Sequence, residues 1–133
     1  PWRVGINKPI QDTSRGISEL EAIVPLDMPK GGLATSGNYR NFKLVNGKKV
    51  AHTINPLTGY PVQTDVLSAT ILAPSCMLAD GLATACMTMT SKDVPAFIAK
   101  FPGVEYLLIL PADGERGFKM QMSDGMRHLI SEP

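Results

Sequence analysis

The sequence predicts an α+β fold in which mostly antiparallel strands are accompanied by two inserted helices. Short runs of β-branched and apolar residues alternate with glycine, proline and asparagine turns along much of the chain. One stretch differs, because "SCMLADGLATACMTM" at 75–89 is dominated by alanine, leucine and methionine, which favour helix. The length of 133 residues is sufficient for one domain with its own core.

Several strands are expected before this helical stretch. The two runs Phe42–Val45 and Val50–Ile54 flank "NGKK", where Asn46-Gly47 predicts a hairpin turn because both residues tolerate positive φ. The other expected strands are Trp2–Ile6, Glu21–Leu26, Leu33–Ser36 and Val66–Ala73.

The helix at 75–89 has Ser75 in position to cap its N-terminus. A second helix is expected over Lys92–Phe101 with Ser91 as its cap, and Pro95 fits only if it lies in the first turn. Further strands are expected at Val104–Leu110 and Phe118–Met122, joined by the turn "PADGERG", and as a last short strand at Met126–Ile130.

Charge and hydropathy exclude some function classes. The net charge is +1 with both signs mixed along the chain, so binding to nucleic acid or to an anionic membrane is not indicated. The longest apolar runs, such as "YLLIL" at 106–110, are too short to span a bilayer. Cys76 and Cys86 are about 15 Å apart if they share one helix, which is too far for a disulfide, and we expect both to be small core residues.

The chain begins "PWRVGIN", without a methionine or signal peptide and already in a strand-like run. We therefore expect it to be the later part of a longer protein, incomplete at the N-terminus.

Asp80 and Thr84 are the first candidates for chemistry. Four residues apart on a helix, they lie on one face, and a carboxylate with a hydroxyl suits Mg²⁺ or Ca²⁺ rather than zinc. Two interpretations are open: Asp80 is a ligand in a buried helix, or the helix is half exposed and Asp80 faces water.

His52 precedes a loop with strong turn chemistry. In "NPLTG" at 55–59, Asn55 can form an Asx-turn and Gly59 permits positive φ. His52 itself is either a general base or ligand, or a partly exposed edge residue.

A third stretch, "GLATSGNYRNF" at 32–42, has the glycine spacing of a phosphate-binding loop, but Asn38 and Tyr39 replace the required Lys-Ser/Thr. Arg40 could reach a phosphate or form a surface ion pair.

Together, "ATSGNYRNF" at 34–42, "HTINPLTGYPV" at 52–62 and "SATILAPSCMLADGLATACM" at 68–87 resemble the ApbE family of flavin transferases in order, spacing and residue type. The resemblance runs from "WRVGI" to nearly the end of the chain. It implies that residues 1–133 are the C-terminal part of a single ApbE-like domain with a T-fold-like architecture.

The resemblance also implies an activity. Members use Mg²⁺ to cleave FAD and transfer FMN to a threonine of a target flavoprotein, releasing AMP, and some instead hydrolyse FAD to FMN and AMP. Targets include subunits of Na⁺-pumping and related membrane redox complexes. Members are bacterial envelope proteins, often lipid-anchored and facing the periplasm.

By position, Asp80 and Thr84 match the family's metal ligands, and His52 matches the histidine of its "H-x-x-D-P-x-T-G" motif, which takes the proton of the acceptor hydroxyl. The residues expected to contact FAD are Ile54, through backbone atoms, with Thr58, Gly59, Ser36 and Arg40.

Two positions depart from the family pattern: Asn55 replaces the motif's aspartate, and Ala83 stands where some members have a second acidic residue. In the family an earlier half of the domain supplies much of the flavin pocket and a further metal contact. A flavin-binding protein without transfer activity, an FAD pyrophosphatase and an inactive fragment therefore remain alternatives.

Overall fold

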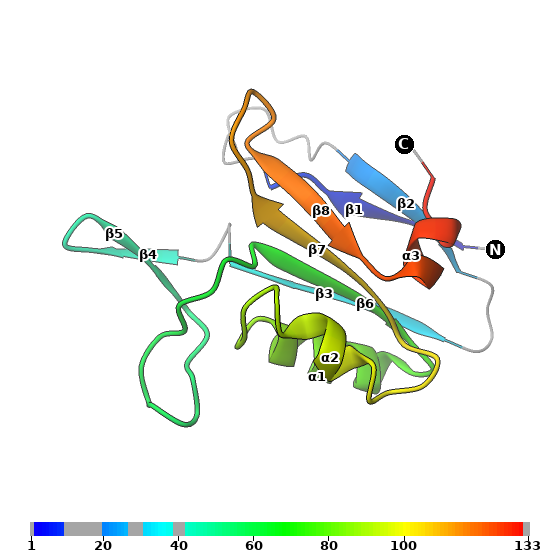
Figure 1. Ribbon diagram of the computed structural model, residues 1–133, viewed down its shortest axis with the longest axis horizontal. Coiled ribbons are helices and arrows are strands. Elements are labelled where there is room, and N and C mark those ends of the chain that lie inside the picture. The colour runs from blue at the N-terminus through cyan, green and yellow to red at the C-terminus, as the bar shows by residue number, and fades with distance from the viewer. Residues whose placement is uncertain (1, 10–19, 27–30, 39–41, 132–133) are drawn as a thin grey trace.

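The computed structural model describes residues 2–9, 20–26, 31–38 and 42–131 (Figure 1). Its central element is an antiparallel sheet with the strand order β3 (Gly32–Gly37), β6 (Ser68–Ala73), β7 (Glu105–Pro111) and β8 (Phe118–Met122). Two helices that join β6 to β7, α1 (Cys76–Cys86) and α2 (Val94–Ile98), cover one face. The two-stranded sheet of β1 (Trp2–Asn7) and β2 (Leu20–Leu26), with helix α3 (Asp124–Leu129), covers the other. The predicted α+β class with antiparallel strands is confirmed.

The core lies on both faces of the central sheet. Side chains of β7 alternate between them, so Leu108 and Leu110 pack with α1 and α2 while Leu107 and Ile109 pack with β1, β2 and α3. Because both faces of β7 are covered, its sequence is a continuous apolar run rather than an alternating one.

A hairpin of β4 (Phe42–Val45) and β5 (Lys48–Ala51) extends away from this body as a separate sheet (Figure 1). The predicted turn is confirmed, since Asn46 and Gly47 have φ values of 51° and 75°. The second strand differs from the expected Val50–Ile54 because the tight turn pairs Val45 with Lys48 and sets the register from there. His52 therefore lies just after the strand.

Most other expected elements are present with ends shifted by one or two residues. Helix α1 is capped by Ser75, whose Oγ accepts a hydrogen bond from the Leu78 amide at 3.2 Å. Helix α2 is shorter than predicted, and its N-cap is Asp93 rather than Ser91, although Pro95 does lie in its first turn. The Ser91 hydroxyl binds another partner, described below.

The expected last strand at Met126–Ile130 is wrong, because Asp124–Leu129 forms helix α3. Met126 is completely buried and Ile130 is partly buried in the same cluster. Met126 lies within the helix and Ile130 follows it as the extended C-cap residue, and a run of five residues is too short to distinguish a helix from a strand by its apolar pattern. The fold thus has a third helix that the sequence pattern did not reveal.

An ion pair and a short bridge connect β1 and β2 to the C-terminal part of the chain. The Arg116 guanidinium donates to the Glu21 carboxylate, which is almost fully buried, and lies 4.9 Å from the centre of the Phe118 ring. The amides of Ile23 and Ser131 each donate to the other's carbonyl, at 2.9 and 3.0 Å.

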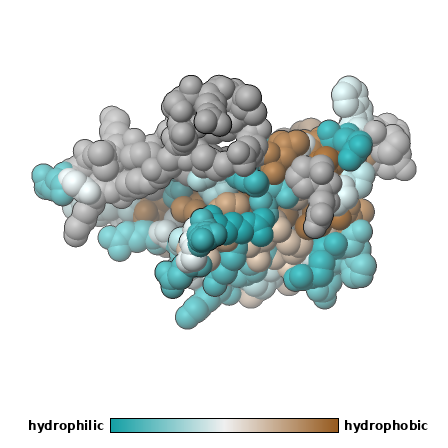
Figure 2. Space-filling view, turned by 90° about the horizontal axis from the view of Figure 1, so that it is seen from above, coloured by the Kyte–Doolittle hydropathy of each residue, from teal (hydrophilic) through white to brown (hydrophobic). Residues whose placement is uncertain are grey.

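In the view from above, polar residues occupy much of the coloured surface, and apolar residues gather toward the end opposite the β4–β5 hairpin (Figure 2). Among the described residues, no helix combines the length and the apolar character of a membrane span.

Candidate functional site

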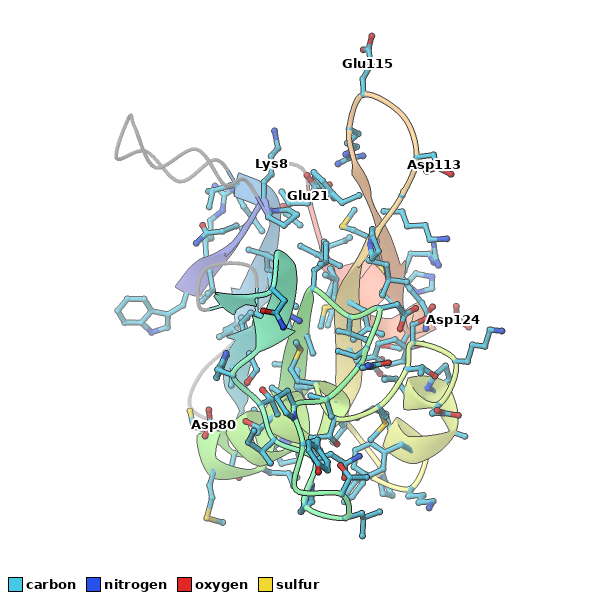
Figure 3. The ribbon with its side chains drawn as sticks, turned by 90° about the vertical axis from the view of Figure 1, so that its left-hand side faces the viewer. Lys8, Glu21, Asp80, Asp113, Glu115 and Asp124 are labelled. Carbon is cyan, nitrogen blue, oxygen red and sulfur yellow. The ribbon has the colours of Figure 1, made fainter. Side chains whose placement is uncertain are left out.

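Helix α1 presents two chemically different faces. Ala79, Leu82, Ala83 and Cys86 are buried against the sheet, whereas Asp80 and Thr84 are exposed. The helix is therefore half exposed, and Asp80 is not a buried charge that needs a partner; its role as a ligand stays a prediction. Asp80 lies on α1 away from Glu21 and from the β7–β8 turn that carries Asp113 (Figure 3).

Strand β3 packs directly against the first turn of α1. A Cβ atom on Gly32 would lie 2.3 Å from the Cys76 nitrogen, a contact that only glycine avoids. Further along β3, the half-buried Ser36 places its Oγ 3.3 Å from the Thr84 Oγ1. Two predicted site residues, 48 positions apart in the sequence, are thus brought into contact.

The donors on this face fit a hard cation. Asp80 offers carboxylate oxygens, and one turn later Thr84 and Ser36 offer a pair of hydroxyl oxygens. Mg²⁺ is commonly held by one or two carboxylates and completes its shell with substrate phosphates and water. Among the described residues, no cluster of three or more His, Cys, Asp or Glu side chains forms a site of another kind. The donor set suits Mg²⁺ as part of a site that a phosphate ligand completes.

The loop after β5 has the predicted turn. The Asn55 side-chain oxygen accepts from the Leu57 amide at 2.9 Å, the Asn55 backbone carbonyl accepts from the Gly59 amide at 2.8 Å, and Gly59 has a φ of 71°. A bridge between Ile54 and Pro61 and a 3.0 Å bond from the Val62 amide to the Thr53 carbonyl close the base of the loop. Asparagine in place of the motif's aspartate therefore still forms the Asx-turn.

The loop presents its expected site residues at the surface. His52, Ile54, Thr58 and Gly59 are all exposed, and so are the apolar side chains of Leu57 and Tyr60. Thr58 contributes to the turn, because its Oγ1 accepts from the Tyr60 amide at 3.3 Å. Arg40 lies outside the described residues, so its predicted role stays a prediction.

The cysteines are unpaired, as predicted, but only one is in the core. Cys86 is completely buried, and burial raises the pKa of its thiol to about 11, so it remains protonated near neutral pH. Cys76 is exposed at the start of α1, so its predicted core position is wrong.

A group of residues that the sequence did not single out joins the loop to the region after α1. The Asp65 carboxylate accepts hydrogen bonds from both the amide and the hydroxyl of Ser91, the former at 2.8 Å. Partial burial would raise the pKa of Asp65, but the bonds from the Ser91 side chain and backbone, the amide of Asp65 itself and the charge of Lys119 outweigh it and lower the pKa. A Thr-Asp pair directly before an apolar strand was the only sequence signal of this connection.

Comparisons with known proteins agree with the motifs. A model described as the ApbE family matches residues 1–108. The chain is 39% identical over 132 residues to the FAD:protein FMN transferase of Vibrio cholerae and 37% identical over 129 residues to that of Haemophilus influenzae. These alignments cover 99% and 97% of this chain but only 37% and 35% of the relatives. The chain thus spans about a third of their length.

Solved structures show the same fold. The flavin transferase ApbE from Vibrio cholerae superimposes with a TM-score of 0.71 at 35% identity, covering 97% of this chain and 38% of that structure. The ApbE protein from Thermotoga maritima superimposes with a TM-score of 0.76 at 30% identity, covering 99% and 39%. The order of the motifs, the family match and these superpositions lead to one conclusion: the chain belongs to the ApbE family.

Proposed function

We propose that the protein carrying this chain transfers FMN from FAD to a threonine hydroxyl of a target flavoprotein, with Mg²⁺ as cofactor and AMP as the second product. The observation that carries the proposal is the hydroxyl pair of Ser36 and Thr84 on the exposed side of α1, one turn from Asp80. It is supported by relatives named FAD:protein FMN transferase over nearly the whole chain.

Asp80 and Thr84 would hold the metal, with Ser36 beside them. A bound Mg²⁺ supplies charge neutralisation at the FAD diphosphate, where negative charge builds as the phosphoryl group moves. Because Asp80 is exposed, the diphosphate can approach it without first opening the core. Because the buried face of α1 is held against the sheet, the helix keeps Asp80 and Thr84 one turn apart when a ligand binds at its exposed face.

His52 would accept the proton of the acceptor hydroxyl. The threonine oxygen forms a bond to the FMN phosphorus, the bond from that phosphorus to the AMP oxygen breaks, and AMP leaves with the electron pair. An imidazole suits this task because it exchanges a proton near neutral pH. His52 lies at the end of β5 and at the start of the stiff loop, where a side chain is exposed to an incoming protein.

The loop would contribute to FAD binding. Ile54, Thr58 and Gly59 are exposed on this turn, and Gly59 adds no side chain that would obstruct a ligand. Arg40 is proposed as a further contact to the cofactor. We place residues 1–133 as the C-terminal part of one flavin-transferase domain, with acceptors in membrane redox complexes and a location at the periplasmic side of the cell envelope.

The test is covalent flavinylation by the full reading frame that encodes this chain. Purified protein is incubated with FAD, Mg²⁺ and an acceptor domain containing the target threonine, and flavin fluorescence is read on a denaturing gel. A fluorescent acceptor band that requires Mg²⁺ supports the proposal. FMN and AMP released without a labelled acceptor would indicate an FAD pyrophosphatase, and bound FAD with neither product would indicate a binding protein.

The second histidine provides a matched control for the role of His52. His128 lies on α3, where its Nδ1 is 2.7 Å from the Asp124 carbonyl. His52→Ala should lower the rate of transfer more than it weakens FAD binding, whereas His128→Ala should change neither. Equal losses of transfer and binding in His52→Ala would reassign His52 as a binding residue.

A further inference from the structure

The segment that carries His52 extends from the body of the molecule as a hairpin and a loop, and it rejoins the body directly before β6. We call residues 42–63 the arm; it comprises β4, β5 and the loop that follows. Figure 1 shows the β4–β5 hairpin at the far left, away from the sheet and helices. The hairpin strands pair with each other, and the chain rejoins the body at Thr64–Val66, directly before β6. The orientation of the arm therefore depends on its attachment.

The first part of the attachment is Thr64. Its hydroxyl donates to the Met89 carbonyl at 2.6 Å and accepts from the Val66 amide at 3.0 Å. One side chain thus joins the base of the arm to the residues that follow α1 and orients the start of β6. On the other strand of the base, the Asn38 amide donates to the Leu67 carbonyl at 3.0 Å.

The second part is Asp65. Its two carboxylate oxygens accept from the amide and the hydroxyl of Ser91, which is itself buried. The Ser91 carbonyl in turn accepts from the Gln121 side chain at 2.9 Å, so β8 supports the same residue. Hydrogen bonds to an ionised carboxylate are stronger than neutral ones, and the lowered pKa of Asp65 agrees with an ionised side chain.

The loop is stiff enough to transmit this attachment to His52. The Asx-turn at Asn55, the Ile54–Pro61 bridge and the Val62–Thr53 bond make residues 53–62 one hydrogen-bonded unit. A rigid unit held at its base keeps its far residues in place, whereas a small rotation at the base moves them all. Positioning to within about 1 Å is what a proton-transfer residue requires.

We propose that Thr64 and Asp65 are positioning residues of the flavin-transfer site, because they lock the arm that carries His52 to the segment that follows the metal-binding helix α1. The expected effect on the rate of FMN transfer rests on the proposed function. The segment 87–91 begins at the C-terminal cap of α1, so the connection sets the position of the proposed base relative to the helix that carries the proposed metal ligands. Neither Thr64 nor Asp65 touches the reacting atoms in this assignment.

The test compares Asp65→Ala, Asp65→Asn and Asp93→Asn in the full reading frame. Asparagine keeps an acceptor for the Ser91 amide, so it should retain part of the function that alanine removes. Asp93 is the matched control: it lies on the same connection, but its described partner is the neighbouring Thr90, at 2.9 Å, and not the arm. We expect kcat for FMN transfer to fall by about tenfold or more in Asp65→Ala, by less in Asp65→Asn, and to remain unchanged in Asp93→Asn.

A double-mutant cycle separates positioning from general damage. If Asp65 acts through His52, then Asp65→Ala should reduce the rate in wild-type protein but have little further effect in a His52→Ala background. Full additivity of the two losses would overturn the proposal.

Hydrogen–deuterium exchange gives a readout that does not depend on activity. Asp65→Ala should accelerate exchange of the Val66 and Ser91 amides, whose hydrogen bonds lie at the base of the arm, while those of β6 and β7 remain protected. Unchanged exchange at Val66, which Asp65 does not itself contact, would overturn the proposal even in an active enzyme. Should the wild-type protein transfer no FMN, the proposed function fails, and the exchange experiment still decides whether Asp65 orders the arm.

Discussion

The body and the arm of this molecule are built by different physical effects. In the body, β6 and β7 are covered on both faces, and most of their side chains are buried. In the arm, Leu57 is 93% exposed and Tyr60 is 74% exposed, and the shape comes from turn hydrogen bonds between residues close in sequence. The body therefore derives its conformation from packing, and the arm from local chemistry.

This difference indicates how the proposed site is divided. The proposed metal ligands lie on a helix whose buried face is held by the core, so their separation is rigid. The proposed base lies on a segment whose own conformation is firm but whose orientation depends on a few hydrogen bonds and the buried Val62 side chain at its base. Substitutions in the body and in the arm should consequently impair the proposed site in different ways.

The largest effect is expected on the body side of the site. Asp80→Ala removes the one carboxylate of the donor set, so Mg²⁺-dependent turnover should fall by at least about 100-fold, because little else neutralises the charge at the phosphorus. The fold should be intact, since Asp80 is exposed, and circular dichroism and the unfolding midpoint check this. The control is Asp113→Ala, an exposed carboxylate on the β7–β8 turn; unchanged turnover in Asp80→Ala would remove the metal assignment.

The second prediction contrasts two glycines. Gly32→Ala forces a Cβ into the backbone of Ser75 and Cys76, so we expect the free energy of unfolding to fall by at least about 2 kcal/mol. Gly59→Ala in the arm adds a Cβ to open space and carries only the cost of positive φ, about 1 kcal/mol, which an exposed loop can relieve locally. Urea unfolding of both variants measures the difference, and equal losses would contradict the contrast.

The third prediction concerns acid pH at the base of the arm. The pKa of Asp65 is lowered in the folded protein, so its ionised form stabilises the attachment above its unfolded pKa. That contribution is lost as the pH falls through the folded value. Because the carboxylate is largely exposed, the loss should be no more than about 1 kcal/mol. The protection factors of the Val66 and Ser91 amides, which correct for the intrinsic pH dependence of exchange, should fall on acidification in the wild type and less so in Asp65→Asn; identical pH dependence in both would show that another group is responsible.

The smallest effect is expected at Gly81 on α1. A Cβ there would meet no other described atom within 4 Å, so Gly81→Ala should raise helix stability by about 1 kcal/mol. The thermal unfolding midpoint measures the gain. Because Gly81 follows Asp80 on the exposed side, a simultaneous loss of FAD binding would indicate that the ligand approaches the helix backbone at this point. A lower midpoint would contradict the prediction.

Local signals in the sequence were sufficient for much of the fold. The Asn46-Gly47 hairpin, the Ser75 cap of α1 and the turn at Asn55 and Gly59 each depend on residues within a few positions of one another, and each was predicted correctly. The order of the motifs in the sequence also indicates the family. A turn or cap formed by residues close in the sequence can be predicted from those residues alone.

What only the tertiary structure decided involves distant residues. The contact of Ser36 with Thr84 depends on Gly32 allowing β3 to approach α1, and the bond of Asp65 to Ser91 joins positions 26 apart. The same limit explains the errors, since Met126 joins a helix through burial on the central sheet and Ser91 caps no helix because Asp65 binds its hydroxyl. The sequence by itself determined the local conformations and the family. Packing between segments that are distant in the sequence decided which elements come into contact and therefore which side chains the site contains.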